Sequence, residues 1–273
     1  MEGDALTKLV DGPPRKIAPQ KLPGHILHLP YPPIIVTIPE MRGDFIVTLL
    51  LLLTLGCAAQ NHTAEGMRFF GQARYDAALA SFRSALQSNP NDANALYNIA
   101  ATYHQSARAS LQLGQTEAAQ QQFEQAVQYY LRSLAQNANH ADAYRGLASL
   151  YMDRQNPEAA FELLGNWNRA NPIAAEPNLE LARLHQEWAQ IVIVQGHTEI
   201  AQRSRDAAAQ ILQHVLTTEP SNYRALRALG FLREQSGDIQ GAVIEYSRSL
   251  QANPQQQDLV ERVAVLTGMS TPQ

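Results

Sequence analysis

The strongest constraint on the fold of this 273-residue chain is an internal repeat. Two heptapeptides, GQTEAAQ at residues 114–120 and GHTEIAQ at residues 196–202, share five letters and lie 82 positions apart. Matching residues at one fixed offset indicate a structural period, so the repetition must be explained before any motif is interpreted as chemistry. The repetition therefore predicts a property of the fold and not an active site.

Three segments share one order of small and large residues. They span residues 59–92, 141–174 and 223–256. The residues that carry this order are Gly66, Phe69, Ala78, Phe82, Ala85 and Pro90 in the first segment, Tyr144, Leu147, Ala148, Tyr151, Ala160 and Pro172 in the second, and Leu226, Leu229, Gly230, Ala242, Tyr246 and Pro254 in the third. The order resembles the tetratricopeptide repeat of 34 residues, which implies a unit of two paired helices.

Two longer segments, residues 93–140 and 175–222, lie between these units. Each exceeds the repeat by about 14 residues, which adds roughly two turns, or 10 Å, to each helix of the pair. The repeated heptapeptide then falls at the turn of the hairpin. There we expect a glycine in the left-handed conformation, a threonine as N-cap and a glutamate near the positive end of the next helix: Gly114, Thr116 and Glu117 in one copy, and Gly196, Thr198 and Glu199 in the other.

A two-helix unit cannot cover both of its apolar stripes alone, so neighbouring units must stack into one continuous core. The sequence therefore predicts an all-α fold, a right-handed α-solenoid of five helical hairpins in which the second and fourth are lengthened. The hairpins are expected at residues 59–92, 93–140, 141–174, 175–222 and 223–256. Apolar residues at helical spacing, Leu259, Val260, Val263 and Leu266, predict a capping helix over residues 257–269 with Gly268 as its stop.

The first 40 residues differ in kind from the repeats. They contain eight of the fifteen prolines and all three lysines, and proline at this density blocks regular hydrogen bonding. We expect an extended, largely unpacked leader. We expect translation to start at Met41, with a start at Met1 as the alternative.

Residues 41–57 resemble a secretory signal peptide. Arg42 is followed by an apolar run over residues 45–56, which is short of the roughly 20 residues that a spanning helix needs. The run ends in LTLGC, which resembles the bacterial lipobox and implies lipidation of Cys57. The resemblance predicts an exported, membrane-anchored lipoprotein of the bacterial cell envelope, facing the periplasm or the exterior. Cleavage after Ala58 or Ala59, retention as a short anchor, and a buried structural cysteine are the alternatives.

The composition argues against several functions. A net charge of −4 and a pI near 6.1 provide no basic field for nucleic acid, so none is expected as a partner. The eight histidines form no pair at metal-ligand spacing, and neither a phosphate loop nor a GxSxG element is present. We therefore expect no catalytic residue, no cofactor and no metal, and a protein that is not an enzyme.

The family resemblance implies a concave groove, lined by the first helix of each hairpin, that accepts a protein or peptide partner. The groove positions of the family fall on Met67, Phe70, Tyr97, Asn98, Ala101, His104, Arg145, Ser149, Met152, Arg183, Gln186, Arg224, Arg227 and Phe231. This mixture of arginine, aromatic residues and methionine favours an acidic or carboxylate-bearing peptide. The alternative for each single residue is an ordinary solvated surface position. Thr63 and Met67 replace the clamp residues of the chaperone-binding members, so that specificity is not expected.

A second candidate surface lies in the fourth, lengthened hairpin. Its sequence WAQIVIV contains more consecutive apolar residues than one narrow helical stripe needs: Trp188, Ile191, Val192, Ile193 and Val194. These residues either pack inside the hairpin, against Ile200 and a neighbouring helix, or form a pairing surface for a homo-oligomer or a membrane. Two functions follow: a membrane-tethered adaptor, or a structural assembly factor that oligomerises through the long hairpins.

Overall fold

The computed structural model describes residues 62–268, and these residues form helices joined by short turns. Residues 62–71 are helical. They are followed by α2 (Tyr75–Ser88), α3 (Ala93–Gln112), α4 (Thr116–Gln136), α5 (Ala141–Asp153), α6 (Pro157–Ala170), α7 (Ala175–Val194), α8 (Thr198–Thr218), α9 (Tyr223–Gln235), α10 (Ile239–Ala252) and α11 (Gln257–Thr267). The predicted leader, signal segment and Cys57 lie outside the described residues.

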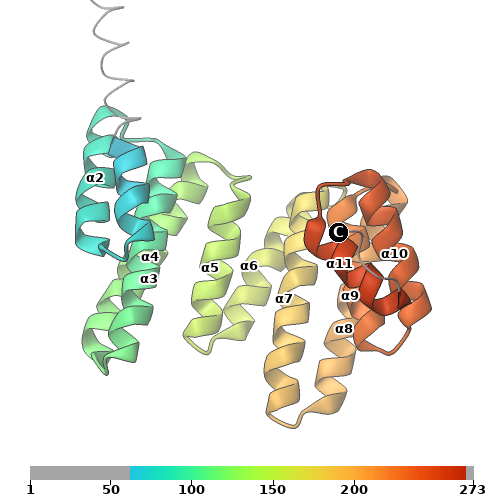
Figure 1. Ribbon diagram of the computed structural model, residues 1–273. Coiled ribbons are helices and arrows are strands. Elements are labelled where there is room, and N and C mark those ends of the chain that lie inside the picture. The colour runs from blue at the N-terminus through green and yellow to red at the C-terminus, as the bar shows by residue number, and fades with distance from the viewer. Residues whose placement is uncertain (1–61, 269–273) are drawn as a thin grey trace, which may run out of the picture. The chain divides into compact units, whose positions relative to one another are not determined.

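The helices form successive hairpins, as Figure 1 shows, and each hairpin packs against the next. The predicted all-α solenoid of paired helices is confirmed. The hairpins α3–α4 and α7–α8 have helices of 20 and 21 residues, whereas α5 and α9 have only 13, so the lengthening of the second and fourth hairpins is also confirmed. Within residues 62–268, no helix combines the length and the apolar character needed to cross a membrane.

Each of the five hairpins within residues 62–268 turns through one residue with a positive φ. Glycine occupies this position in three of them, as Gly114, Gly196 and Gly237, and the left-handed conformation predicted for the first two is confirmed. Ala73 and Gln155 take the same conformation in the short first and third hairpins, although a side chain disfavours it.

The prediction that Thr116 and Thr198 are N-caps is wrong by one position. Gln115 and His197 are the N-caps, and neither makes a side-chain capping bond. Only one residue separates the left-handed glycine from the next helix, so the threonine is already the first helical residue. In the last hairpin Asp238 stands at this position, and its carboxylate accepts a hydrogen bond from the Gly241 amide at 2.9 Å.

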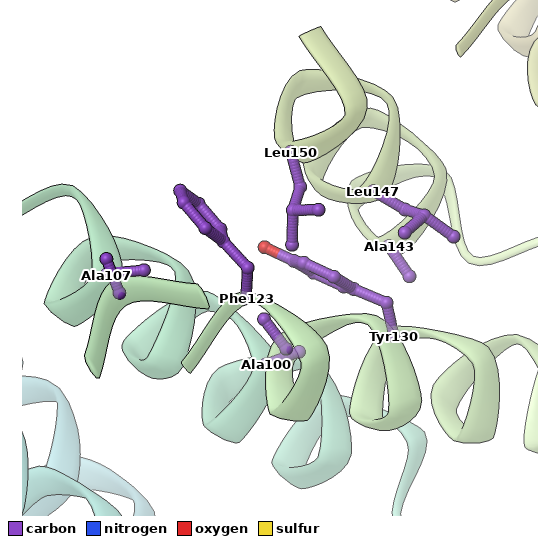
Figure 2. Packing of buried hydrophobic residues seen from close by; sticks show 9 residues of the cluster. Ala100, Ala107, Phe123, Tyr130, Ala143, Leu147 and Leu150 are labelled. Carbon is purple, nitrogen blue, oxygen red and sulfur yellow. The ribbon is translucent and has the colours of Figure 1, made fainter. Parts of the chain in front are cut away.

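The largest core cluster shows how one hairpin packs on the next. Figure 2 shows Phe123 and Tyr130 of α4 between the alanines of α3 and the side chains Leu147 and Leu150 of α5. Tyr130 is only 2% exposed, and its ring would lie 2.6 Å from a Cβ added at Gly146. A small residue on the first helix thus makes room for a large one on the second helix of the preceding hairpin.

The capping helix α11 closes the last hairpin, as the sequence predicted. Leu259 is buried against Ala242 and Tyr246 of α10, and Val263 and Leu266 pack partly on the same cluster. Gly268 takes a left-handed conformation at the end of the helix, with φ 70°, which confirms it as the stop.

Candidate partner-binding surface

Ion pairs connect the first helices of successive hairpins. Asp153 of α5 accepts from His104 and Arg108 of α3 at 2.7 Å. Arg145 of α5 reaches across to α7, Arg224 of α9 also reaches α7, and Arg227 of α9 reaches α11. The surface expected to form the groove therefore carries a series of arginine–carboxylate contacts from α3 to α11.

Glu180 of α7 is the centre of this series, with a side chain only 1% exposed. The Nε of Arg145 donates to both of its carboxylate oxygens at 3.0 Å, and the Nε of Arg183 donates at 2.9 Å. Burial alone would raise the pKa of Glu180, but the hydrogen bonds from Arg145 and Arg183 outweigh it, so the pKa lies below its usual range. Glu180 therefore stays ionised at neutral pH. A third arginine, Arg224, donates from its Nη2 to the Oε1 of Glu180 at 3.4 Å.

The arginines that were expected to bind a partner thus form ion pairs with carboxylates of the chain itself. Arg145 also contacts Asp142 at 2.7 Å, Arg183 contacts Glu187 at 2.9 Å, and Arg224 contacts Glu176 at 2.6 Å. Sequence reasoning missed Glu176 and Glu180. Their spacing of four residues, which places both on one face of α7, was the available signal.

Four other expected groove residues take part in internal packing. His104 is 4% exposed with its Nε2 2.7 Å from Asp153, so the expectation that it meets a partner is corrected: the stacking of α3 on α5 buries it. Tyr97 is partly buried, with its ring 5.3 Å from that of His140, and this burial raises its pKa. Asn98 is half-buried. Met152 packs partly on the cluster around Leu164 and Trp167.

Two expected groove residues lie on the helical residues 62–71. Met67 is 50% exposed, while Phe70 is half-buried and meets the ring of Tyr75 edge-on at 6.2 Å. The first hairpin therefore presents one apolar side chain to solvent at these positions.

Four of the expected residues, Gln186, Arg224, Arg227 and Phe231, line a pocket of about 690 Å³. Its lining comes mainly from α9 and α11 and comprises Gln186, Tyr223, Arg224, Arg227, Ala228, Phe231, Glu234, Tyr246, Gln256, Asp258, Leu259 and Arg262. Phe231 is 43% exposed and Tyr223 39%. The pocket combines accessible aromatic surface with guanidinium groups, the two features that suit a peptide side chain and a carboxylate.

The candidate pairing surface is mostly internal. Val192 is 1% exposed, and Trp188 and Ile193 pack on the cluster that it forms with Ala189 and Ala201. Ile191 is partly buried. Val194 is 87% exposed at the end of α7, and Ile200 is 44% exposed in the first turn of α8. Most of the apolar run is thus buried within the hairpin, because α8 covers it.

Comparison with known proteins identifies the family. The family model for the TPR repeat matches residues 66–106, and the tetratricopeptide repeat model matches residues 111–168 and 193–256. The chain belongs to the tetratricopeptide repeat family. Members bind protein or peptide partners and are typically non-enzymatic scaffolds, so this chain has the fold of a protein-binding scaffold.

Individual relatives are distant. The BBSome complex member BBS4 homolog of Drosophila melanogaster is 24% identical over 200 residues, which cover 73% of this chain and 38% of that protein. Among solved structures, the thermophilic TPR protein TTC0263 of Thermus thermophilus is 26% identical, with 78% of this chain and all of that chain covered and a TM-score of 0.49. YrrB, described as a TPR protein with an unusual peptide-binding site, is 13% identical over 74% of this chain and 89% of its own, with a TM-score of 0.39.

Proposed function

We propose that this chain is a membrane-tethered adaptor that binds a segment of a protein partner, with the pocket between α9 and α11 as its principal anchor. The observation that carries the proposal is the pocket, where the expected residues Arg224, Arg227 and Phe231 meet. The arginines pair with carboxylates of the chain both in the pocket and elsewhere along the first helices, and His104 is buried. The pocket differs because it offers two partly exposed aromatic rings beside the guanidinium groups.

Partner capture by variants of the pocket tests the adaptor. The full chain is used as bait for detergent-solubilised membranes, and proteins retained by wild type are compared with those retained by Phe231→Ala. Ile244→Ala is the matched control, because Ile244 is 59% exposed on α10 and does not line the pocket. Loss of a specific partner with Phe231→Ala alone is the expected result. Equal retention by both variants would contradict the assignment of the pocket.

The tether rests on the sequence of residues 41–57, whose resemblance to a lipoprotein signal favours acylation of Cys57. In that case the scaffold follows closely after the anchor, because the described helix begins at residue 62. Mass spectrometry of the mature N-terminus measures the modification, and Cys57→Ser should release the protein from the membrane fraction. An unmodified thiol at Cys57 would rule out this tether.

A second candidate function is assembly through the long hairpins, favoured by the exposure of Val194 and Ile200 at the α7–α8 turn. Val194→Asp changes this surface without entering the hairpin core. Light scattering after size-exclusion chromatography should show an oligomer for wild type and a smaller species for the variant. A wild-type monomer would eliminate this candidate.

A further inference from the structure

One face of α9 presents an arginine between two aromatic residues. Tyr223, Arg227 and Phe231 succeed one another at intervals of four residues and all line the pocket. Residues at this interval are neighbours on the helix surface. Tyr223 is 39% exposed and Phe231 43%, and the side chain of Arg227 is 45% exposed, so all three are accessible together.

Arg227 is held differently from the other arginines of this surface. Its ion-pair partner within residues 62–268 is Asp258 of α11, at 2.5 Å, and the Asp258 side chain is 66% exposed. By contrast, Arg145, Arg183 and Arg224 all contact Glu180, which is 1% exposed, and Arg262 contacts Glu234, which is 14% exposed. An ion pair between exposed groups is weak and easily exchanged, whereas removing a buried carboxylate from its arginines is costly.

We propose that Asp258 occupies the place of a partner carboxylate, and that the partner segment contains an acidic residue with large apolar residues two positions to either side. The acidic side chain replaces Asp258 on Arg227, and the apolar side chains contact Tyr223 and Phe231. This inference rests on the proposed function and specifies the partner's chemistry.

The spacing supports an extended partner segment. Four residues of α9 advance about 6 Å along the helix axis. Every second residue of an extended chain points to the same side, at intervals of about 6.6 Å. An apolar–x–acidic–x–apolar segment therefore matches the Tyr223–Arg227–Phe231 stripe in both order and spacing.

The test uses two fluorescein-labelled peptides of nine residues. In the first, phenylalanine, glutamate and phenylalanine occupy alternate central positions with serine elsewhere, and in the second glutamine replaces the glutamate. Fluorescence anisotropy measures binding to the full chain in mild detergent. We expect wild type to prefer the glutamate peptide by about two- to fivefold, the range of an exposed ion pair.

Two variants test the exchange directly. Asp258→Asn removes the internal competitor, so binding of the glutamate peptide should strengthen by about two- to fivefold and binding of the glutamine peptide should not change. Arg227→Gln should abolish the preference between the peptides. Glu261→Gln is the matched control for Asp258→Asn, because Glu261 is an exposed carboxylate of the same helix outside the pocket.

The outcomes separate this inference from the adaptor proposal. No binding of either peptide, or equal affinities in wild type and Asp258→Asn, would overturn the carboxylate exchange. If Phe231→Ala still abolishes capture of the natural partner, the pocket remains the anchor and only its partner chemistry is wrong. If Phe231→Ala leaves capture intact, the assignment of the pocket itself fails.

Discussion

At the residue scale, the most consequential side chain is Glu180, because three first helices meet at its carboxylate. Arg145 comes from α5 and Arg224 from α9, while Glu180 and Arg183 lie on α7. A buried carboxylate with several arginine donors is stable only as a complete set, since each missing partner leaves a charge in a poorly solvated place. The cluster therefore links three successive hairpins.

Glu180→Gln should lower the free energy of unfolding by about 2 kcal/mol, because it removes the negative charge and one of the two acceptor oxygens that Arg145 and Arg183 share. Glu187→Gln is the control, since within residues 62–268 Glu187 forms an ion pair with Arg183 alone, and its side chain is 36% exposed. Urea denaturation followed by circular dichroism measures both. The pKa of Glu180 is lowered in the folded state, so this stability is present above pH 4.5 and is lost as the pH falls through the folded pKa. Equal effects of the two variants would argue against the cluster.

His185 predicts a second pH dependence. Its ring lies 4.8 Å from that of Phe161, and its Nδ1 is buried without a hydrogen-bond partner in the described structure. Burial lowers the pKa of His185 below the usual 6.5, so the unfolded chain binds the proton more readily. Stability should fall as the pH drops below 6.5. Urea midpoints at pH 7.5 and 5.5 should differ less for His185→Gln than for wild type. If the midpoints at the two pH values differ as much in His185→Gln as in wild type, His185 is not the cause of the pH dependence.

At the scale of the elements, the glycines within helices differ in how closely a neighbouring side chain approaches them. A Cβ at Gly230 of α9 would lie 2.6 Å from the Tyr246 ring of α10. At Gly165 of α6 the nearest atom, at 3.5 Å, is the flexible end of Arg169. The first glycine permits a close approach of two helices, while the second only weakens its helix.

The two glycines should therefore respond oppositely to alanine. Gly230→Ala is expected to destabilise the protein by about 1–3 kcal/mol through overpacking. Gly165→Ala should stabilise it by about 0.5–1 kcal/mol, the difference in helix propensity. Thermal unfolding of the pair provides the comparison. A loss of stability in both variants would contradict the open environment of Gly165.

The turns show how far local sequence determined these elements. Gly114 and Gly196 were predictable because only glycine takes a left-handed conformation without cost. Ala73 and Gln155 were not, because the same turn is imposed on them by the packing of the helices that they join. The N-caps at Gln115 and His197 were missed for a related reason, since a one-residue link leaves the threonine inside the helix.

At the scale of the whole molecule, each hairpin depends on its neighbours for burial, and α11 provides this for the last one. In the cluster of Ala242, Tyr246 and Leu259, the α11 residue is Leu259, which is 4% exposed. Polar contacts add to it, because Gln256 is 5% exposed and donates to the carbonyls of Ser249 and Asn253. The hydrogen bonds of Gln256 and the apolar contacts of Leu259 thus both hold α11 against α10.

Removal of residues 257–273 should expose Tyr246 and Ala242 and lower the stability of the last hairpin in particular. Hydrogen exchange is the suitable measurement: amides of α9 and α10 should lose protection, while those of α3 and α4 should keep it. Leu259→Ala, which keeps the helix, should show a smaller loss in the same region. A uniform loss along the chain would show that the hairpins unfold as one unit.

The sequence by itself determined the number of hairpins, their unequal lengths and the capping helix, because these depend on local periodicity and turn chemistry. The tertiary structure decided which charged residues remain available to a partner. Arg145 and Glu180 are 35 positions apart, and Arg227 and Asp258 are 31 apart, so their pairing depends on how the hairpins stack. Periodicity places a residue on a face of its helix, but only the stacked neighbour determines whether that residue is buried, as His104 is, or exposed, as Phe231 is.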